Sequence, residues 1–178
     1  SSFLCLFCTY LIAKKITSKT TSFISVLSLS SMPLWIQYSR YASPDVPFVL
    51  SILLIILFFL KSLDYSKSFS KYFYIFISGF FVSFSFFIRS YMAFVPLIGL
   101  FPFLIYQLYS QKSIYKTIFF TGILVGSIPT FLNIYFSYQK FGIPGITTLF
   151  DFAREQALGE VNFNFNNLLL IPLKFLYL

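Results

Sequence analysis

The sequence predicts an all-α protein, a polytopic bundle of transmembrane helices, and three observations support this class. The 178 residues are 58% hydrophobic and only 10% charged. Their mean hydropathy is +0.83, and long apolar runs recur between short charged breaks. A soluble domain of this size lacks the polar surface needed to cover such runs. Because the chain starts and stops inside apolar runs and lacks an initiator Met, we expect a fragment of a larger membrane domain.

The apolar runs divide this single transmembrane domain into successive spans. The spans lie near residues 1–13, 20–38, 47–60, 72–88, 91–109, 117–138 and 168–178. The stretch 72–109 would be about 57 Å long as one helix, nearly twice the hydrocarbon thickness, so it must fold back at Arg89-Ser90. The run 47–60 would be only about 21 Å long. Either flanking residues extend it, with Lys61 reaching the interface, or its outer end is recessed.

The stretch 139–167 is the longest polar segment and is predicted to be a loop on the outer face of the membrane. Apolar residues recur within it at helical spacing, and Gly159 follows them, which predicts a short interfacial helix. Asp151, Arg154 and Glu155 lie off this apolar stripe. A charged face of this kind is usually solvated, and contact with an acceptor substrate is the alternative interpretation.

The basic residues predict the orientation of the chain in the membrane. One set of alternate loops holds only lysines, and the other holds fewer basic residues. The first set contains Lys14, Lys15, Lys19, Lys61, Lys67, Lys71, Lys112 and Lys116; the second contains Arg40, Arg89, Lys140 and Arg154. The positive-inside rule places the lysine loops in the cytoplasm and Asp45 on the outer face. Topology thus explains the net charge of +8, and no nucleic-acid partner is expected.

A single CxxC motif, Cys5 and Cys8, lies inside the first apolar run. The chain has no second pair and no His. Because tetrahedral zinc needs four ligands and this region supplies two, the two thiols are interpreted as packing residues.

Asp45 is the first candidate for chemistry, because it interrupts the apolar sequence in the segment S-R-Y-A-S-P-D-V-P at 39–47. A carboxylate there can bind a cation, accept a proton or cap the next helix. A residue that precedes a proline is pushed out of the helical region, so Ser43 and Val46 are predicted to be extended, and Pro47 suits the first helical position. Asp45 would then lie one residue before the ideal cap position. This placement favours an ionised carboxylate in a stiff linker, acting as a metal ligand or a proton acceptor.

The segment S-R-Y-A-S-P-D-V-P-F-V-L at 39–50 leads into an apolar helix, a Lys-containing loop and two apolar segments split by a basic residue. This order resembles the GT-C class of membrane glycosyltransferases, in the protein mannosyltransferase and aminoarabinose transferase branch. The resemblance implies that Asp45 is a catalytic acid of the second outer loop, with acidic partners in a first outer loop before Ser1. In such families these acids activate the acceptor or hold a divalent cation against the donor phosphate. Asp45 is therefore also the candidate metal ligand, and a divalent cation is the candidate cofactor.

The resemblance further implies a function and its location. A sugar would move from a polyprenyl-phosphate donor to an unidentified acceptor at the periplasmic or lumenal face of a multi-pass protein, in a bacterial inner or plasma membrane. Arg40 and Arg89 would contact the lipid phosphate, since a guanidinium suits bidentate phosphate binding, or would only anchor their helices at the interface. A secondary transporter and a non-catalytic membrane scaffold remain alternatives. The transporter would show a second similar half, and the scaffold would leave Asp45 replaceable.

Overall fold

The computed structural model describes residues 1–40, 43–64, 69–89, 93–109, 113–148 and 151. Within these ranges the backbone is helical and contains no strand, so the predicted all-α class is confirmed. The main helices are α1 (Ser2–Ile16), α2 (Lys19–Ser31), α3 (Pro33–Arg40), α4 (Asp45–Asp64), α5 (Phe69–Arg89), α6 (Phe94–Tyr109) and α7 (Ser113–Phe141).

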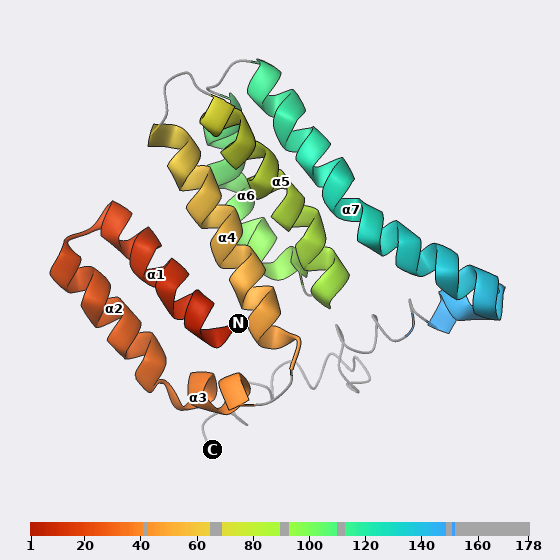
Figure 1. The fold of residues 1–178 in the computed structure, drawn as a ribbon, viewed down its shortest axis with the longest axis horizontal. Coiled ribbons are helices and arrows are strands. Elements are labelled where there is room, and N and C mark those ends of the chain that lie inside the picture. Colours follow the sequence, from red (N-terminus) through yellow and green to blue (C-terminus); the bar gives the residue numbers. More distant parts are fainter. Residues whose placement is uncertain (41–42, 65–68, 90–92, 110–112, 149–150, 152–178) are drawn as a thin grey trace, which may run out of the picture.

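Five of these helices lie side by side in the order α2, α1, α4, α5 and α7 (Figure 1). Helix α6 lies behind this row and packs against α4 through a cluster formed by Ile55, Phe59, Ala93, Leu97 and Leu104. Helix α3 is short and lies across one end of α1 and α2 (Figure 1). The bundle therefore has two ends, which differ in their charged residues.

The lysines gather at one end of the bundle, which we call the lysine end. There α1, α4 and α6 finish and α2, α5 and α7 begin. Among the described residues the lysines at this end are Lys14, Lys15, Lys19, Lys61, Lys71 and Lys116. Lys15 forms a 2.6 Å ion pair with Asp64 and also donates to the carbonyl oxygen of Leu60, which joins α1 to α4. The opposite end, where α4 begins and α5 finishes, is called the Asp45 end.

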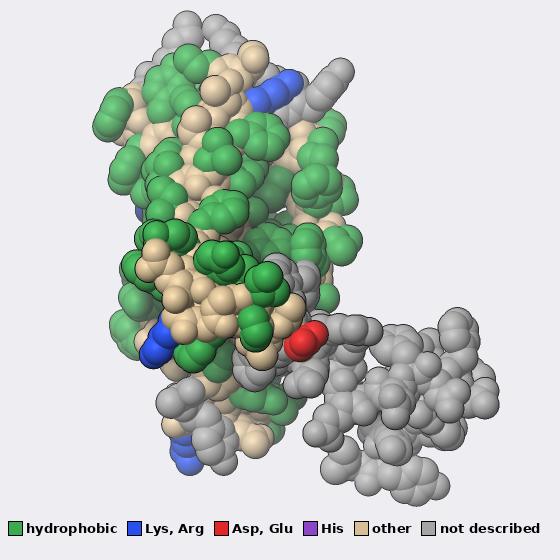
Figure 2. Space-filling view, turned by 90° about the vertical axis from the view of Figure 1, so that its right-hand side faces the viewer, with side chains coloured by type: hydrophobic (Ala, Val, Ile, Leu, Met, Phe, Trp, Pro, Cys, Tyr) green, Lys and Arg blue, Asp and Glu red, His purple; other side chains and the backbone are tan. Residues whose placement is uncertain are grey.

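Within the described ranges, three helices are long and apolar enough to cross a membrane, namely α4, α5 and α7. Helix α4 has 20 residues and a mean hydropathy of 2.6. Its length is about 30 Å, which matches the hydrocarbon thickness. Of the two interpretations of the short run 47–60, the structure shows the first, because residues on both sides extend the helix. Hydrophobic side chains cover most of the face shown in Figure 2, and charged side chains are sparse on it.

The start of α4 differs from the sequence prediction. Pro47 was expected at the first helical position, with Val46 extended and Asp45 in the linker, whereas the helix begins at Asp45. The first backbone hydrogen bond runs from the amide of Phe48 to the carbonyl oxygen of Pro44, at 3.0 Å. The N–H groups before Phe48 have no partner within the helix in any case, so Pro47 costs the first turn no hydrogen bond.

The predicted span 20–38 is also divided into two helices in the structure. Helix α2 ends at Ser31, and Met32 has an extended backbone with φ −65° and ψ 125°. The residue before a proline is driven out of the helical region, and Pro33 then begins α3 at the first position, where its missing N–H is harmless. Because of this break, α3 lies across the Asp45 end of the bundle and does not continue the direction of α2 (Figure 1).

The predicted outer loop at 139–167 is described only in part. Helix α7 continues to Phe141 and ends at Gly142, whose φ of +67° is in the left-handed region that favours glycine. Residues 143–148 are helical. The rest of the predicted interfacial helix, including Arg154, Glu155 and Gly159, and the span 168–178 lie outside the described residues.

Helices α5 and α7 touch backbone to backbone. A Cβ atom built on Gly79 of α5 would overlap the carbonyl oxygen of Phe119. On α7, Cβ atoms on Gly122 and Gly126 would overlap the carbonyl oxygens of Phe76 and Phe80. Small residues four apart allow this approach between membrane helices, where packing replaces the hydrophobic effect as the force of association. These glycines hold α5, the helix that carries Arg89, against α7.

Candidate functional site

Asp45 and Arg89 form an ion pair at the Asp45 end. An Nη of Arg89 lies 2.6 Å from Oδ1 of Asp45, and the two side chains are 25% and 28% exposed, respectively. Asp45 is in the first turn of α4 and Arg89 in the last turn of α5, and these helices pack against each other. The helix macrodipole stabilises a negative charge in the first turn of a helix, such as that of Asp45, and a positive charge in the last turn, such as that of Arg89. The fold therefore holds both charges at the ends of rigid helices.

Ser43 completes the contacts of the Asp45 carboxylate. Its hydroxyl donates to Oδ2 of Asp45, and the Asp45 amide donates to the Ser43 hydroxyl at 3.3 Å. Both carboxylate oxygens thus face side-chain donors. Among the described residues, the contacts of the carboxylate come from side chains and not from a backbone N–H of α4.

A pocket of about 230 Å³ adjoins Asp45 on the side of α2 and α3. Among the described residues, Asp45 is the only acidic or basic side chain that lines it. The other lining residues are Leu29, Met32, Leu34, Trp35, Tyr38, Val46 and Val49. We call this space the α3 pocket.

A second cavity, of about 420 Å³, lies among α5, α6 and α7, and we call it the α6 groove. Every described residue that lines it is apolar. On α5 the lining residues are Val82 and Phe86. Arg89 is not among the lining residues, but it follows Phe86 by three residues and so lies on the same face of α5, one turn farther along the helix.

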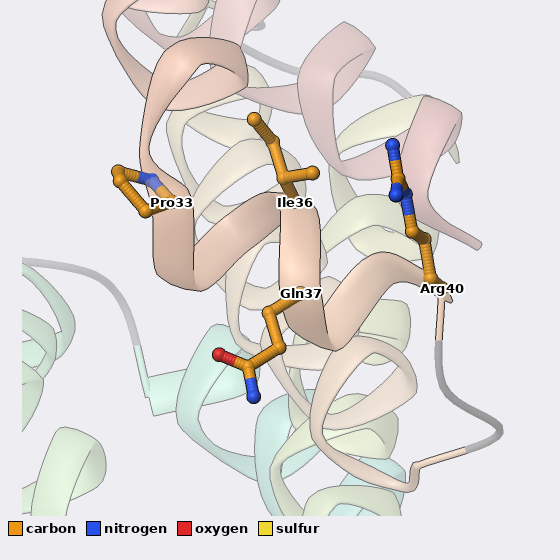
Figure 3. A pocket seen from close by; sticks show the side chains of 4 residues that line it. All are labelled: Pro33, Ile36, Gln37 and Arg40. Carbon is orange, nitrogen blue, oxygen red and sulfur yellow. The ribbon is translucent and has the colours of Figure 1, made fainter.

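The other candidate residues are not brought to this pair. Arg40 is exposed at the end of α3 and lines a separate recess of about 610 Å³ with Pro33, Ile36 and Gln37 (Figure 3). In the described part of the chain, the ion pair of Asp45 is with Arg89 and not with Arg40. Asp151 is exposed and helical. Arg154 and Glu155 lie outside the described residues, so the suggested acceptor contact of this charged face stays a prediction.

The described residues around Asp45 do not fit a divalent cation. Mg²⁺ and Ca²⁺ take six or more oxygen ligands, usually including carboxylates. Here one carboxylate faces a guanidinium at 2.6 Å, and no group of three His, Cys, Asp or Glu residues occurs in the described ranges.

Cys5 and Cys8 are free and buried in the contact between α1 and its neighbours. The Cys5 thiol lies 3.6 Å from the carbonyl oxygen of Val46, in the first turn of α4. The pair therefore packs α1 against the helix that carries Asp45.

Sequence reasoning missed two parts of the site, Ser43 and the α6 groove. The signal for Ser43 was its position two residues before an aspartate, where a hydroxyl can close a local hydrogen-bonded turn. The signal for the groove was the spacing of Val82, Phe86 and Arg89, which places them on one face of a helix. Neither signal shows which helices lie opposite.

The comparisons with known proteins give one match. The model of a family described as dolichyl-phosphate-mannose-protein mannosyltransferase matches residues 1–136, about three quarters of the chain. No curated protein and no solved structure matches this chain.

Proposed function

Because the chain belongs to the dolichyl-phosphate-mannose-protein mannosyltransferase family, which is of the GT-C type, we propose that it transfers a sugar from a polyprenyl-phosphate donor at the outer face of the membrane. Membership makes it an integral membrane glycosyltransferase with several apolar helices. The donor and the face are our proposal. The observation that carries it is the Asp45–Arg89 pair, which lies at the end of the bundle opposite the lysine end. Arg89 follows Phe86, a lining residue of the α6 groove, by three residues on α5.

The distribution of basic residues supports the outer face. The lysine end gathers six described lysines, whereas the described basic residues of the Asp45 end are Arg40, Arg89 and Lys140. The positive-inside rule then assigns the lysine end to the cytoplasm and the Asp45–Arg89 pair to the periplasm or lumen.

The apolar lining of the α6 groove and the charge of Arg89 support a lipid-phosphate donor. An isoprenoid chain has no polar groups, so it can fill a cavity lined by apolar residues such as Val82 and Phe86 without losing hydrogen bonds. A phosphate at the end of such a chain would reach the level of Arg89, one helical turn beyond Phe86. A guanidinium binds phosphate oxygens in a bidentate manner, as it binds a carboxylate.

The same arrangement supports a role for Asp45 in the transfer. The donor phosphate and the Asp45 carboxylate compete for Arg89, so donor binding releases one carboxylate oxygen from its ion pair. That oxygen accepts the proton of the acceptor hydroxyl as the hydroxyl oxygen bonds to the anomeric carbon. The bond from this carbon to the phosphate oxygen breaks, and the polyprenyl phosphate leaves with the electron pair, facing Arg89.

Replacing Arg89 with Gln is expected to raise the apparent KM for the lipid donor by about 10- to 100-fold, because a charged hydrogen bond contributes about 1.5–3 kcal/mol. The measurement uses the intact protein in lipid vesicles with labelled polyprenyl-phosphate sugars. Lys140→Gln is the control, since Lys140 is basic, exposed and at the same end on α7.

An unchanged KM in Arg89→Gln would leave Arg89 only an anchoring role. If the unmodified protein cleaves none of the labelled polyprenyl-phosphate sugars, the proposed donor class is wrong.

A further inference from the structure

The α3 pocket lies on the opposite side of Asp45 from Arg89. Its lining residues come from α2, α3 and α4, whereas Arg89 belongs to α5. In the row of helices, α2 and α5 are on opposite sides of α4 (Figure 1). Asp45 therefore lies between the proposed phosphate site at Arg89 and the α3 pocket.

Direct displacement at the anomeric carbon requires a space for the acceptor on the side of Asp45 that faces away from Arg89. When a nucleophile displaces a leaving group directly, it approaches from the face of the sugar opposite the leaving group. With the phosphate at Arg89, that approach comes from the side of the α3 pocket. The base must also lie within hydrogen-bond reach of the acceptor hydroxyl, and Asp45 lines this pocket.

The lining of the α3 pocket indicates the chemistry of its occupant. In the described part of the lining, Trp35 and Tyr38 are the residues besides Asp45 whose side chains offer hydrogen bonds, and the others are aliphatic or Met. A peptide acceptor would bring several backbone amides into this space, and each buried amide without a partner costs free energy. A single hydroxyl on an apolar body needs only Asp45.

Exposed apolar side chains line part of the α3 pocket. Leu34 is 67% exposed and Met32 is 52% exposed, and both lie where α2 and α3 meet. Exposed apolar residues beside membrane helices contact lipid, so a lipid can enter the pocket sideways from the outer leaflet. Resting on the proposed function, we infer that the α3 pocket is the acceptor site and that the acceptor is a lipid with a free hydroxyl group.

The inferred step balances with these two substrates alone. The lipid hydroxyl oxygen forms a bond to the anomeric carbon and gives its proton to Asp45. The bond between this carbon and the phosphate oxygen breaks, and the polyprenyl phosphate retains the electron pair. The products are a glycosylated lipid and a polyprenyl phosphate, and no oxidant or other reactant is needed.

A substitution that fills the pocket tests the inference. In the intact protein in vesicles, Val49→Trp places an indole in the α3 pocket. The acceptor probe is the total lipid extracted from the membranes that carry the protein, and a water-soluble peptide rich in Ser and Thr is supplied in parallel. Val95→Trp is the matched control, because Val95 is 70% exposed on α6 and lines neither cavity.

We expect the label to move from the donor into a lipid product that survives the mild acid that cleaves the donor. Val49→Trp should raise the half-saturating concentration of acceptor lipid at least 10-fold, while the apparent KM for the donor changes less than two-fold. Val95→Trp should change neither value. This split distinguishes an acceptor pocket from a general effect on folding or on the donor.

Three results would overturn the inference. The first is transfer of the label to the peptide and not to lipid. The second is a Val49→Trp protein whose acceptor and donor constants change equally or not at all. The third is an unmodified protein that releases no sugar from any donor, which would remove the proposed function itself and is told apart by the absence of donor cleavage.

Discussion

Replacing Asp45 with Asn is expected to lower the rate of sugar transfer by about 100- to 10,000-fold, the usual contribution of a general base. The amide of Asn has nearly the shape of the carboxylate but cannot accept the proton of the acceptor hydroxyl. It also loses the charge that faces Arg89 at 2.6 Å. The rate is measured with labelled polyprenyl-phosphate sugars, and the amount of protein in the membrane is measured alongside.

Asp64→Asn is the matched control for this experiment. Asp64 lies at the other end of α4 and forms its own 2.6 Å ion pair, with Lys15. Its side chain is 59% exposed, and exposed ion pairs contribute at most about 1 kcal/mol. We expect the Asp64→Asn variant to transfer sugar at a rate within about two-fold of that of the unmodified protein, since Asp64 has no role in the proposed chemistry. Normal turnover by Asp45→Asn would remove Asp45 from the mechanism, and an equal loss in both variants would indicate a defect in α4 rather than in the site.

Replacing Gly122 with Val is expected to destabilise the bundle by about 3 kcal/mol or more. A side chain at this position would overlap the carbonyl oxygen of Phe76, which is part of the α5 backbone. Rotation of a side chain cannot relieve such an overlap, so α5 and α7 must separate. Because α5 carries Arg89, transfer activity should fall together with the folded fraction. The measurements are the monodisperse fraction in mild detergent and the free energy of unfolding.

Gly99→Val in α6 is the control for Gly122→Val. Nothing lies within 4 Å of a Cβ atom built on Gly99, so the same substitution should be tolerated there. Valine has a slightly higher helix propensity than glycine, which makes a small gain in stability the expected result. If the two variants unfold alike, the α5–α7 contact does not depend on the close approach at Gly122.

Hydropathy and the length of the apolar runs were enough to predict the broad architecture. Hydropathy alone predicts an all-α membrane protein, because uninterrupted apolar runs have no other stable arrangement in lipid. The excessive length of 72–109 requires a reversal, and in the structure α5 ends at Arg89 and α6 begins at Phe94. Local rules were less reliable at prolines. Pro33 breaks a predicted span after Met32, whereas Pro47 lies inside the first turn of α4 at no cost in hydrogen bonds.

For the candidate site, the sequence singled out Asp45 and Arg89 separately and for different reasons. Asp45 was recognised as a charge between two prolines, and Arg89 as the basic residue at a turn. Nothing in the sequence excluded Arg40 as the partner of Asp45, since Arg40 is much closer along the chain. The packing of α4 against α5 decides the pair, because it brings the first turn of one helix beside the last turn of the other.

The sequence by itself determined the class of the protein and the approximate places of its helices, and it singled out Asp45 as a candidate site residue. These properties depend on neighbouring residues, because hydropathy, proline geometry and isolated charges act within a few positions along the chain. The tertiary structure alone decided that Arg89 faces Asp45, that Gly122 lets α7 touch α5, and that an apolar pocket adjoins Asp45. Those properties depend on which helices become neighbours, and side-chain packing across the bundle determines that choice.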